Sequence, residues 1–524
     1  MKLSYLWIAP EINPINGKAR SIPVLNVWNI YGRVYFFSWF GFMVAFWAWY
    51  AFPPLITRII KSDLHLTTAE IANSNIVSLV ATLFVRNLAG PLCDQFGPRR
   101  VFASLLLAGS IPLGLAPLVQ NANGLYASRF FIGILGGSFV PCLVWCTAFF
   151  DKNVVGSANA LAGGWGNAGG GITYFIMPAV FNSLSARGYS NGESWRLTFL
   201  VPLVVVLVTS VAMLVFCPDT PTGKWSERHL HADENLASLG VSVPADPEHG
   251  IIEKKLSSAS DENVPEFEKK KDEEKIPTTT SNSSHHHQPT DYHSDSELLG
   301  IAHGEIVQKP TVNGIFKIIV SPQTLFHLVT YFCSFGAELA IEAVLSAFYT
   351  AAFPGINPTR AANLAAIFGF LNFVTRPAGG FLSDYLYRTT RGGLWAKKIA
   401  VVVCGVISGV FLIIIGNTTK NTGGGNAMSA TLTLTTLLAV FVEAGNGANF
   451  GLVPHVHPWA NGVVSGTTGA AGNLGGVVFS IIFRFTGNSA NYAQAFWVIG
   501  VITIMLNLAL SWVPPVPRGQ IGGR

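Results

Sequence analysis

Two arginines, Arg86 and Arg376, lie deep inside apolar segments that are long enough to cross a membrane. Each precedes an aspartate, Asp94 or Asp384, by two helical turns, which is about 12 Å along a helix axis and too far for a guanidinium to reach interfacial water. Neither arginine has an acidic residue within four positions. An arginine at this depth costs several kcal/mol to insert, so the pair indicates a function.

The two guanidinium groups would leave excess positive charge in a shared site unless an anion neutralised it. A guanidinium is planar with forked donors, which suits a small planar oxyanion better than a sugar or a bulky cation. The alternative is that each arginine is structural and pairs with an acid on another helix. Arg129, Arg196 and Arg484 lie nearer to the ends of apolar segments, and we predict that they anchor the chain at interfacial water.

Two Gly-Asn-x-Gly-Gly segments offer further polar groups for such an anion. The amides of Asn167 and Asn473 can donate hydrogen bonds, and the neighbouring glycines let a backbone approach closely. The alternative is that these glycines only pack helices together. They are Gly166, Gly169, Gly170, Gly472, Gly475 and Gly476.

The composition is that of a membrane protein. The 524 residues are 50% hydrophobic and 12% charged, with a mean hydropathy of +0.42. Soluble domains carry roughly 25% charged residues. A net charge of +5 gives no basic stripe of the kind that nucleic acid requires. The six cysteines form no CxxC pair or His-spaced metal set, so we expect no disulfide, metal or cofactor.

Twelve apolar segments can each cross a hydrocarbon layer as a helix, since about 20 residues suffice. They cover about 34–56, 69–92, 101–120, 125–150, 155–182, 195–217, 321–352, 361–384, 397–416, 428–453, 462–486 and 490–514. The predicted fold is an all-α membrane protein with two six-helix halves. The predicted domains are an N-terminal segment (1–33), a first half (34–217), a central loop (218–316), a second half (317–515) and a tail (516–524).

The regions outside the apolar segments predict how the chain sits in the membrane. The central loop is charged or rich in Ser and Thr, so we predict that it is largely disordered. Lysine and arginine are more frequent in the short loops on the side of both termini. By the positive-inside rule, both termini and the central loop face the cytoplasm.

A short pattern recurs in the two halves. Arg86, Gly90 and Asp94 have the same spacing as Arg376, Gly380 and Asp384. Together with the Gly and Arg-Arg that follow Asp94, the first copy resembles the loop signature of the major facilitator superfamily, which implies two pseudo-symmetric halves and a cytoplasmic latch. The second copy lacks that Gly and Arg pair, so its latch should be weaker. The predicted latch residues are Gly90, Asp94, Gly97, Arg99, Arg100 and Asp384.

The glycine-rich segments extend this resemblance. Residues 162–171 and 469–477 resemble the two signatures of the nitrate/nitrite porter family, and the opening Trp39–Phe46 agrees with it. The long central loop is similar to that of fungal high-affinity nitrate transporters. The resemblance implies nitrate import, with nitrite as a second substrate, across the plasma membrane. It implies that Arg86 and Arg376 grip the anion beside Asn167 and Asn473.

The resemblance also implies that aromatic residues close the anion site. By position the candidates are Phe46, Phe139, Tyr331 and Phe450, although an aromatic residue in an apolar helix more often belongs to the core. 

Accumulation of an anion in a cell with a negative interior needs a driving ion. It costs about 2.3 kcal/mol per charge for each 100 mV. The family resemblance suggests proton symport, with more than one proton per nitrate if the voltage is to help. Glu338 and Glu342 lie one turn apart on one helix face and are the candidate relay, and Glu443 is a further carboxylate within another predicted span. The alternative is that they pair with a membrane arginine.

Other functions remain open at this point. The chain could carry a different small anion, exchange nitrate for nitrite, or act as a nitrate sensor that signals through the central loop. That loop could be phosphorylated by kinases, which suits a sensor and a regulated carrier equally. An enzyme is not predicted, because there is no phosphate loop, metal set or nucleophile–base arrangement.

Overall fold

The computed structural model describes residues 3–228, 230–231, 234–235, 311–353, 355–356, 358–390, 393–418, 425–486 and 492–517. The described residues form helices and connecting turns, with no β-strand among them. Most of the predicted central loop, residues 236–310, lies outside the described residues.

Each half contains six long helical segments. In the first half these are α1 (Ile30–Trp49), α4 (Thr68–Phe96), α5 (Pro98–Leu115), α6 (Ala122–Ile132) continued by α7 (Phe139–Phe149), α8 (Val155–Ala186), and α9 (Asn191–Thr198) continued by α10 (Leu200–Phe216). In the second half they are α15 (Pro322–Ala352), α16 (Pro358–Thr389), α17 (Leu394–Thr418), α18 (Gly425–Leu452), α19 (Asn461–Thr486) and α20 (Tyr492–Ala509).

Ten helical segments of the described chain are long and apolar enough to cross a membrane. The remaining two long helices, α8 and α16, have 32 residues each and contain the Gly-Asn segment and Arg376. The predicted all-α membrane fold is therefore confirmed, and the helix order agrees with the prediction of twelve spans.

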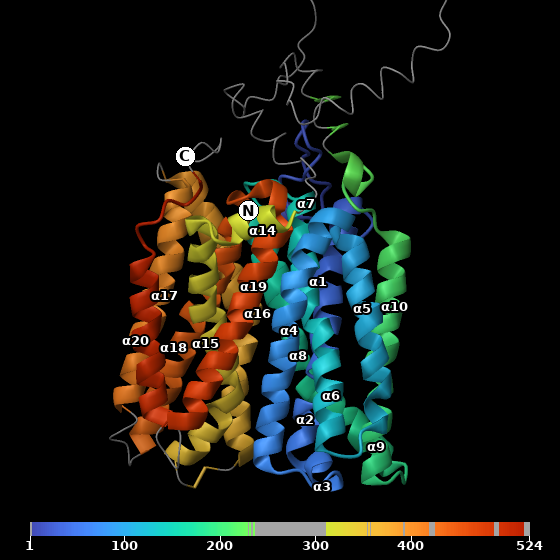
Figure 1. Cartoon of the computed structure of the whole chain (residues 1–524), viewed down its shortest axis with the longest axis vertical. Coiled ribbons are helices and arrows are strands. Elements are labelled where there is room, and N and C mark those ends of the chain that lie inside the picture. The colour runs from blue at the N-terminus through green and yellow to red at the C-terminus, as the bar shows by residue number, and fades with distance from the viewer. Residues whose placement is uncertain are drawn as a thin grey trace, which may run out of the picture.

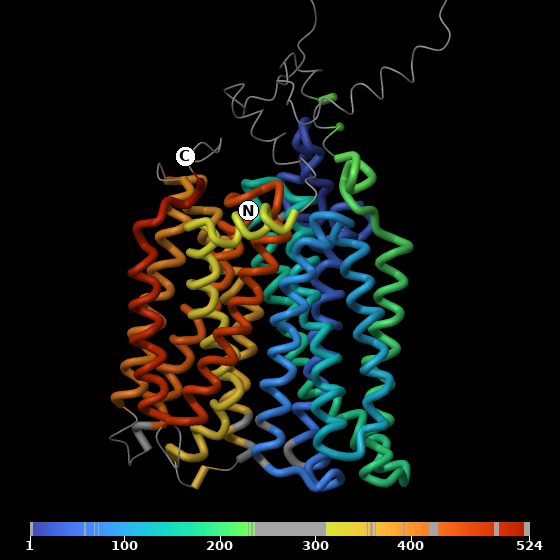
Figure 2. The backbone as a smooth tube through the Cα atoms, in the orientation of Figure 1, coloured from blue at the N-terminus to red at the C-terminus, as the bar shows by residue number. Residues whose placement is uncertain are grey.

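The two halves stand side by side as parallel bundles (Figure 1). The tube in Figure 2 shows that both described ends of the chain lie at one end of the bundle, which we call the N/C end. Across the interface α4 packs on α19, and α8 packs on α16. Glycines permit these close crossings: a Cβ on Gly90 would lie 2.3 Å from the Gly462 carbonyl oxygen. This crossing brings Arg86 on α4 toward the second half.

Local sequence signals explain where the helices that carry the arginines begin and end. A capping box, in which Thr67 and Glu70 bond reciprocally, starts α4. Gly97, with φ +87°, separates α4 from α5, and Pro98 begins the next helix. Between α6 and α7 the chain tightens into a 3₁₀ segment, Gly133–Ser138.

Residues 10–24, which we call the strap, pack onto the N/C end of the bundle. The Ala19 amide donates to the Phe149 carbonyl, and the Asp151 amide donates to the Ala19 carbonyl, each at 2.9 Å. Asn13, Ile15 and Ala19 are fully buried. The first residues of the predicted central loop also pack here, since the Trp225 indole donates to the Asp94 carbonyl at 2.8 Å. Both segments thus cover the same end of the first half.

Candidate anion site

Arg86 and Arg376 meet at the middle of the interface between the halves. Their side chains are 0% and 1% exposed. The guanidinium carbon of Arg86 lies 4.8 Å from the Phe139 ring centroid and 5.5 Å from that of Phe335. The guanidinium carbon of Arg376 lies 5.6 Å and 5.7 Å from the same two centroids. One arginine from each half therefore faces a single aromatic pair.

Each arginine has one terminal nitrogen without a partner among the described residues. Arg86 donates from Nε to the Gly136 carbonyl and from Nη1 to the Gly469 carbonyl, both at 3.0 Å, which leaves Nη2. Arg376 donates from Nη2 to the Tyr331 hydroxyl at 2.7 Å, which leaves Nη1. Buried donors are normally satisfied. Two orphaned cationic donors that face the same two rings can be satisfied together by an anion.

Aromatic rings enclose the two guanidinium groups. Tyr331 stacks on Phe335, and both Phe139 and Tyr331 meet Phe450 edge to face at about 5 Å. Phe139, Tyr331 and Phe450, three of the predicted aromatic residues, thus lie together around the arginines. Phe46 lies further away: it packs on Phe42, which in turn contacts Phe139.

Sequence reasoning missed Phe335 and the Gly136 carbonyl. Phe335 follows Tyr331 by one helical turn, so their shared face of α15 was a signal that could have identified it. The Gly136 carbonyl belongs to the 3₁₀ segment between α6 and α7, and a backbone acceptor leaves no mark in side-chain patterns.

Asn473 shares a hydrogen-bond acceptor with Arg86, whereas Asn167 is related to Arg376 only through a neighbouring glycine on α8. Asn473 donates to the Gly469 carbonyl at 3.0 Å, the same oxygen that Arg86 contacts, and its Oδ1 has no partner among the described residues. Both amide atoms of Asn167 are likewise without a described partner. Asn167 lies one turn from Gly163, where a Cβ would stand 3.3 Å from Arg376 Nε.

Most of the signature glycines pack helices against one another. A Cβ on Gly166 would overlap Phe42, and one on Gly169 would overlap the Met43 carbonyl, so α8 lies directly on α1. Gly472 and Gly475 do the same for α19 on α15. Gly476 is close to Leu339, whereas a Cβ on Gly170 would make only ordinary contact, 3.9 Å from a Phe46 ring carbon.

The predicted latch residues lie at the N/C end. Asp94 accepts hydrogen bonds from the Gly462 and Val463 amides at 2.8 and 2.9 Å, so it caps α19 of the other half. Gly97 lies beside Trp225. Arg99 and Arg100 turn away from the interface toward Asp219, which lies 2.7 Å from Arg99 Nε and 4.0 Å from Arg100 Nη2.

Asp384 on α16 is the counterpart of Asp94, since it also contacts a helix of the other half. It accepts from the amide and hydroxyl of Ser157 on α8, at 2.5 and 2.6 Å. Lys397 on α17 donates to it at 2.8 Å. Asp384 thus pairs with a lysine from the next helix, whereas the Arg pair of the first half pairs with Asp219.

Three acidic residues of the second half form a cluster, and two of them, Glu338 and Glu443, interact electrostatically with Arg376. Glu338 accepts from the amides of Asn372 and Asn446. Glu443 on α18 is 0% exposed and contacts the Thr375 hydroxyl. Glu342 is half-buried one turn further along α15. The predicted pair thus belongs to a larger cluster, to which Glu443 adds a third carboxylate.

Arg129 differs from its prediction as an interfacial anchor. It is 6% exposed and donates from Nη2 to Asn75 Oδ1 at 2.6 Å. The reason is that α6 packs on α4 at this height and encloses the side chain.

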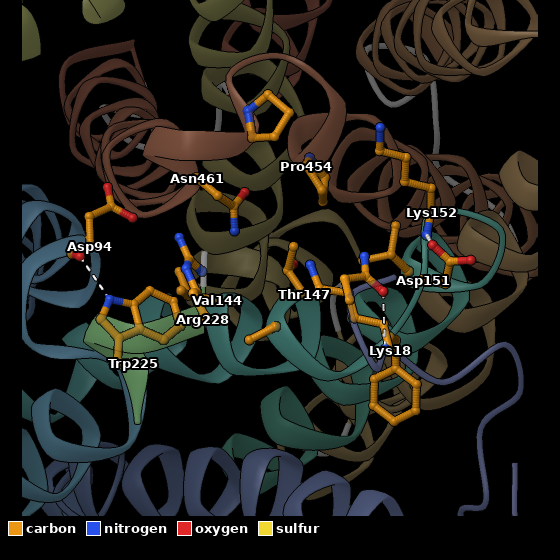
Figure 3. A pocket seen from close by; sticks show the side chains of 15 residues that line it. Lys18, Asp94, Val144, Thr147, Asp151, Lys152, Trp225, Arg228, Pro454 and Asn461 are labelled. Carbon is orange, nitrogen blue, oxygen red and sulfur yellow. Dashed lines mark hydrogen bonds between the residues drawn. The ribbon is translucent and has the colours of Figure 1, made fainter. Parts of the chain in front are cut away.

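A separate pocket of about 50 Å³ lies at the N/C end. Figure 3 shows Lys18 of the strap, Asp94, Trp225 and Arg228 facing Pro454 and Asn461 of the second half across it. None of the predicted substrate residues lines this pocket. It belongs to the closed N/C end and not to the anion site.

Comparison with known proteins agrees with this architecture. Residues 38–458 match the family model of the Major Facilitator Superfamily. The chain belongs to the major facilitator superfamily. The proton:xylose symporter XylE has the same fold, with a TM-score of 0.60, 14% identity, and coverage of 92% of this chain and 95% of that one. The chain is therefore a multi-pass membrane transport protein and not an enzyme.

Its relatives include nitrate transporters. High affinity nitrate transporter 2.5 of Arabidopsis thaliana is 28% identical over 95% of this chain and 82% of the relative. Nitrate/nitrite transporter NrtP of Nostoc punctiforme is 28% identical over 93% of both chains. Elsinochrome transporter 1 of Elsinoe fawcettii is 34% identical over 99% of this chain and all of the relative. The resemblance to nitrate/nitrite porters is thus confirmed.

Proposed function

We propose that this chain imports nitrate, and also nitrite, by alternating access, with the anion held between Arg86 and Arg376. The observation that carries the proposal is the pair of orphaned guanidinium nitrogens, Arg86 Nη2 and Arg376 Nη1, above one aromatic pair. A planar monovalent anion can accept from both nitrogens at once. The Tyr331 hydroxyl, which accepts from Arg376, keeps its own proton to donate to the same anion.

Two features favour a small anion over a bulky cargo. The guanidinium groups are fully enclosed, and rings of Phe139, Phe335 and Phe450 pack around them. Several relatives over most of the chain are named as nitrate transporters. The relative named as an elsinochrome transporter makes that compound the comparison cargo for the test.

The import direction depends on sidedness. We place the N/C end in the cytoplasm, following the distribution of lysine and arginine, and the protein in the plasma membrane, following the resemblance to nitrate/nitrite porters. Asp94 and Asp384 join the halves at that end, so the latch residues would keep the inner gate closed in this structure. Release of these contacts would open the site inward.

We assign the driving ion to protons, carried by a buried carboxylate of the second half; the sequence predicted Glu338 and Glu342 for this role. Both lie on α15, and Glu338 interacts electrostatically with Arg376. Kinases acting on the central loop would regulate the carrier.

The test is uptake of labelled nitrate by the purified chain in proteoliposomes with an inward proton gradient. We expect accumulation above the external concentration, inhibition by nitrite, and collapse of the gradient of nitrate when a protonophore is added. Nitrate-dependent release of internal nitrite without net accumulation would indicate an exchanger. Binding without movement would indicate a sensor, and uptake of elsinochrome unaffected by nitrate would overturn the cargo.

A further inference from the structure

The buried carboxylates beside Arg376 differ in their hydrogen-bond partners. Both oxygens of Glu338 accept amide hydrogens, from Asn372 and Asn446. An ionised carboxylate is an acceptor only, so this arrangement suits the charged form. Glu338 therefore acts as the fixed counter-charge of Arg376, with which it interacts electrostatically.

Glu443 has a different environment. Its Oε2 contacts the hydroxyl of Thr375, and its Oε1 has no partner within the part of the chain that the structure describes. The side chain is 0% exposed. Burying an ionised carboxylate with one hydrogen bond is costly, whereas the neutral acid needs fewer partners.

The Thr375 hydroxyl links two acceptors with one proton. Its oxygen lies 2.9 Å from the Leu371 carbonyl oxygen and also contacts Glu443 Oε2. If the hydroxyl donates to Leu371, Glu443 must carry a proton and donate to Thr375. If Glu443 is ionised, Thr375 turns its proton toward it. The contact therefore has two arrangements that differ by one proton, without any movement of the backbone.

We propose that Glu443 is the residue that binds the transported proton, with Thr375 as the neighbour that accommodates both of its charge states. This inference rests on the proposed nitrate–proton symport and moves the relay from the predicted Glu338 and Glu342 pair to α18. Glu338 stays ionised as the partner of Arg376. Glu342 is half-buried, whereas Glu443 is fully buried, so the charge of Glu443 is the costlier one to keep.

The charges around the site explain why proton and anion would bind together. The groups that act electrostatically on Glu443 are Glu338 and Glu342 on α15 and Arg376 on α16. Among the fully buried groups, Arg86 and Arg376 with ionised Glu338 leave one positive charge. In the empty carrier this positive charge offsets the cost of burying an ionised Glu443 with one hydrogen bond, and the two charges cancel. Once nitrate binds, the site carries one negative charge in excess, so Glu443 takes up a proton. Because the two binding equilibria are linked, protonation of Glu443 in turn strengthens nitrate binding.

Glu443→Gln tests this inference, because glutamine imitates the protonated acid in size and can donate to Thr375. In proteoliposomes we expect the variant to retain exchange of internal for external labelled nitrate, and to lose accumulation driven by a proton gradient. The matched control Glu11→Gln, at an exposed carboxylate of the strap, should retain both activities. Full proton-driven accumulation by Glu443→Gln would overturn the assignment of Glu443. Absence of nitrate exchange in the unmodified chain would instead refute the proposed function.

The pH dependence of nitrate binding separates proton binding from a structural role. In the unmodified chain, nitrate affinity measured by calorimetry should fall as pH rises, while in Glu443→Gln it should stay constant over the same range. Equal pH dependence in both proteins would contradict the inference. If Glu443→Gln does not fold, Glu443→Asp and Thr375→Val provide the same comparison. Each should shift the pH at which affinity falls, and an unshifted curve in both would overturn it.

Discussion

Replacement of Arg86 by lysine should weaken nitrate binding strongly while leaving the fold intact. The guanidinium uses two nitrogens on the carbonyls of Gly136 and Gly469, at 3.0 Å each, and offers the third to the anion. Lysine keeps the charge but has a single nitrogen, which cannot span the same three positions. It must give up at least one charge-assisted hydrogen bond, worth about 1.5–3 kcal/mol. That corresponds to a rise of about 10- to 150-fold in the nitrate dissociation constant.

The assay is binding of nitrate to detergent-purified protein by calorimetry, with surface expression and thermal unfolding as checks of folding. Arg187→Lys is the matched control, because Arg187 is exposed in the turn after α8. This variant should bind nitrate with the affinity of the unmodified chain. Arg376→Lys should behave like Arg86→Lys. Near-normal affinity in both buried variants, with the control also unaffected, would refute the reasoning that forked donors hold the anion.

Three further outcomes follow from the contacts. Gly166→Ala should prevent stable expression, because the new Cβ would stand 1.8 Å from a Phe42 ring carbon. Gly170→Ala should express normally, because its Cβ would lie 3.9 Å from the nearest neighbouring atom. Equal expression of the two variants would contradict the packing of α8 on α1. Tyr331→Phe removes the hydroxyl that accepts from an arginine and should raise the nitrate dissociation constant about tenfold, measured by calorimetry; unchanged affinity would exclude the hydroxyl from the site. Asp94→Asn weakens the contact with the α19 amides and should increase labelling of a cysteine introduced behind the inner gate; unchanged labelling would argue against a latch.

The arginine pair could be predicted because it repeats between the halves, whereas the aromatic residues around it were expected from the family resemblance. Arg86 and Arg376 stand at equal distances from Asp94 and Asp384, and a buried unpaired charge is conspicuous in an apolar segment. The same holds for Asn167 and Asn473. Their matched positions in the two Gly-Asn segments were enough to expect both beside the anion.

Other parts of the site depend on packing that the sequence does not display. The Gly136 carbonyl binds Arg86 only because the chain tightens into a 3₁₀ segment there. Glu443 approaches Thr375 only because α16 packs on α18. Glu338 and Glu342 could be paired from the sequence because they lie one turn apart on one helix. The strap was expected to be a polar end segment, yet its backbone pairs with the chain after α7.

The most direct test of the two-arginine site is an experimental structure of the chain with nitrate bound. The account predicts a planar density between Arg86 Nη2 and Arg376 Nη1, within hydrogen-bond distance of both and of the Tyr331 hydroxyl. Nitrate bound elsewhere, or contacting only one of the two arginines, would contradict it.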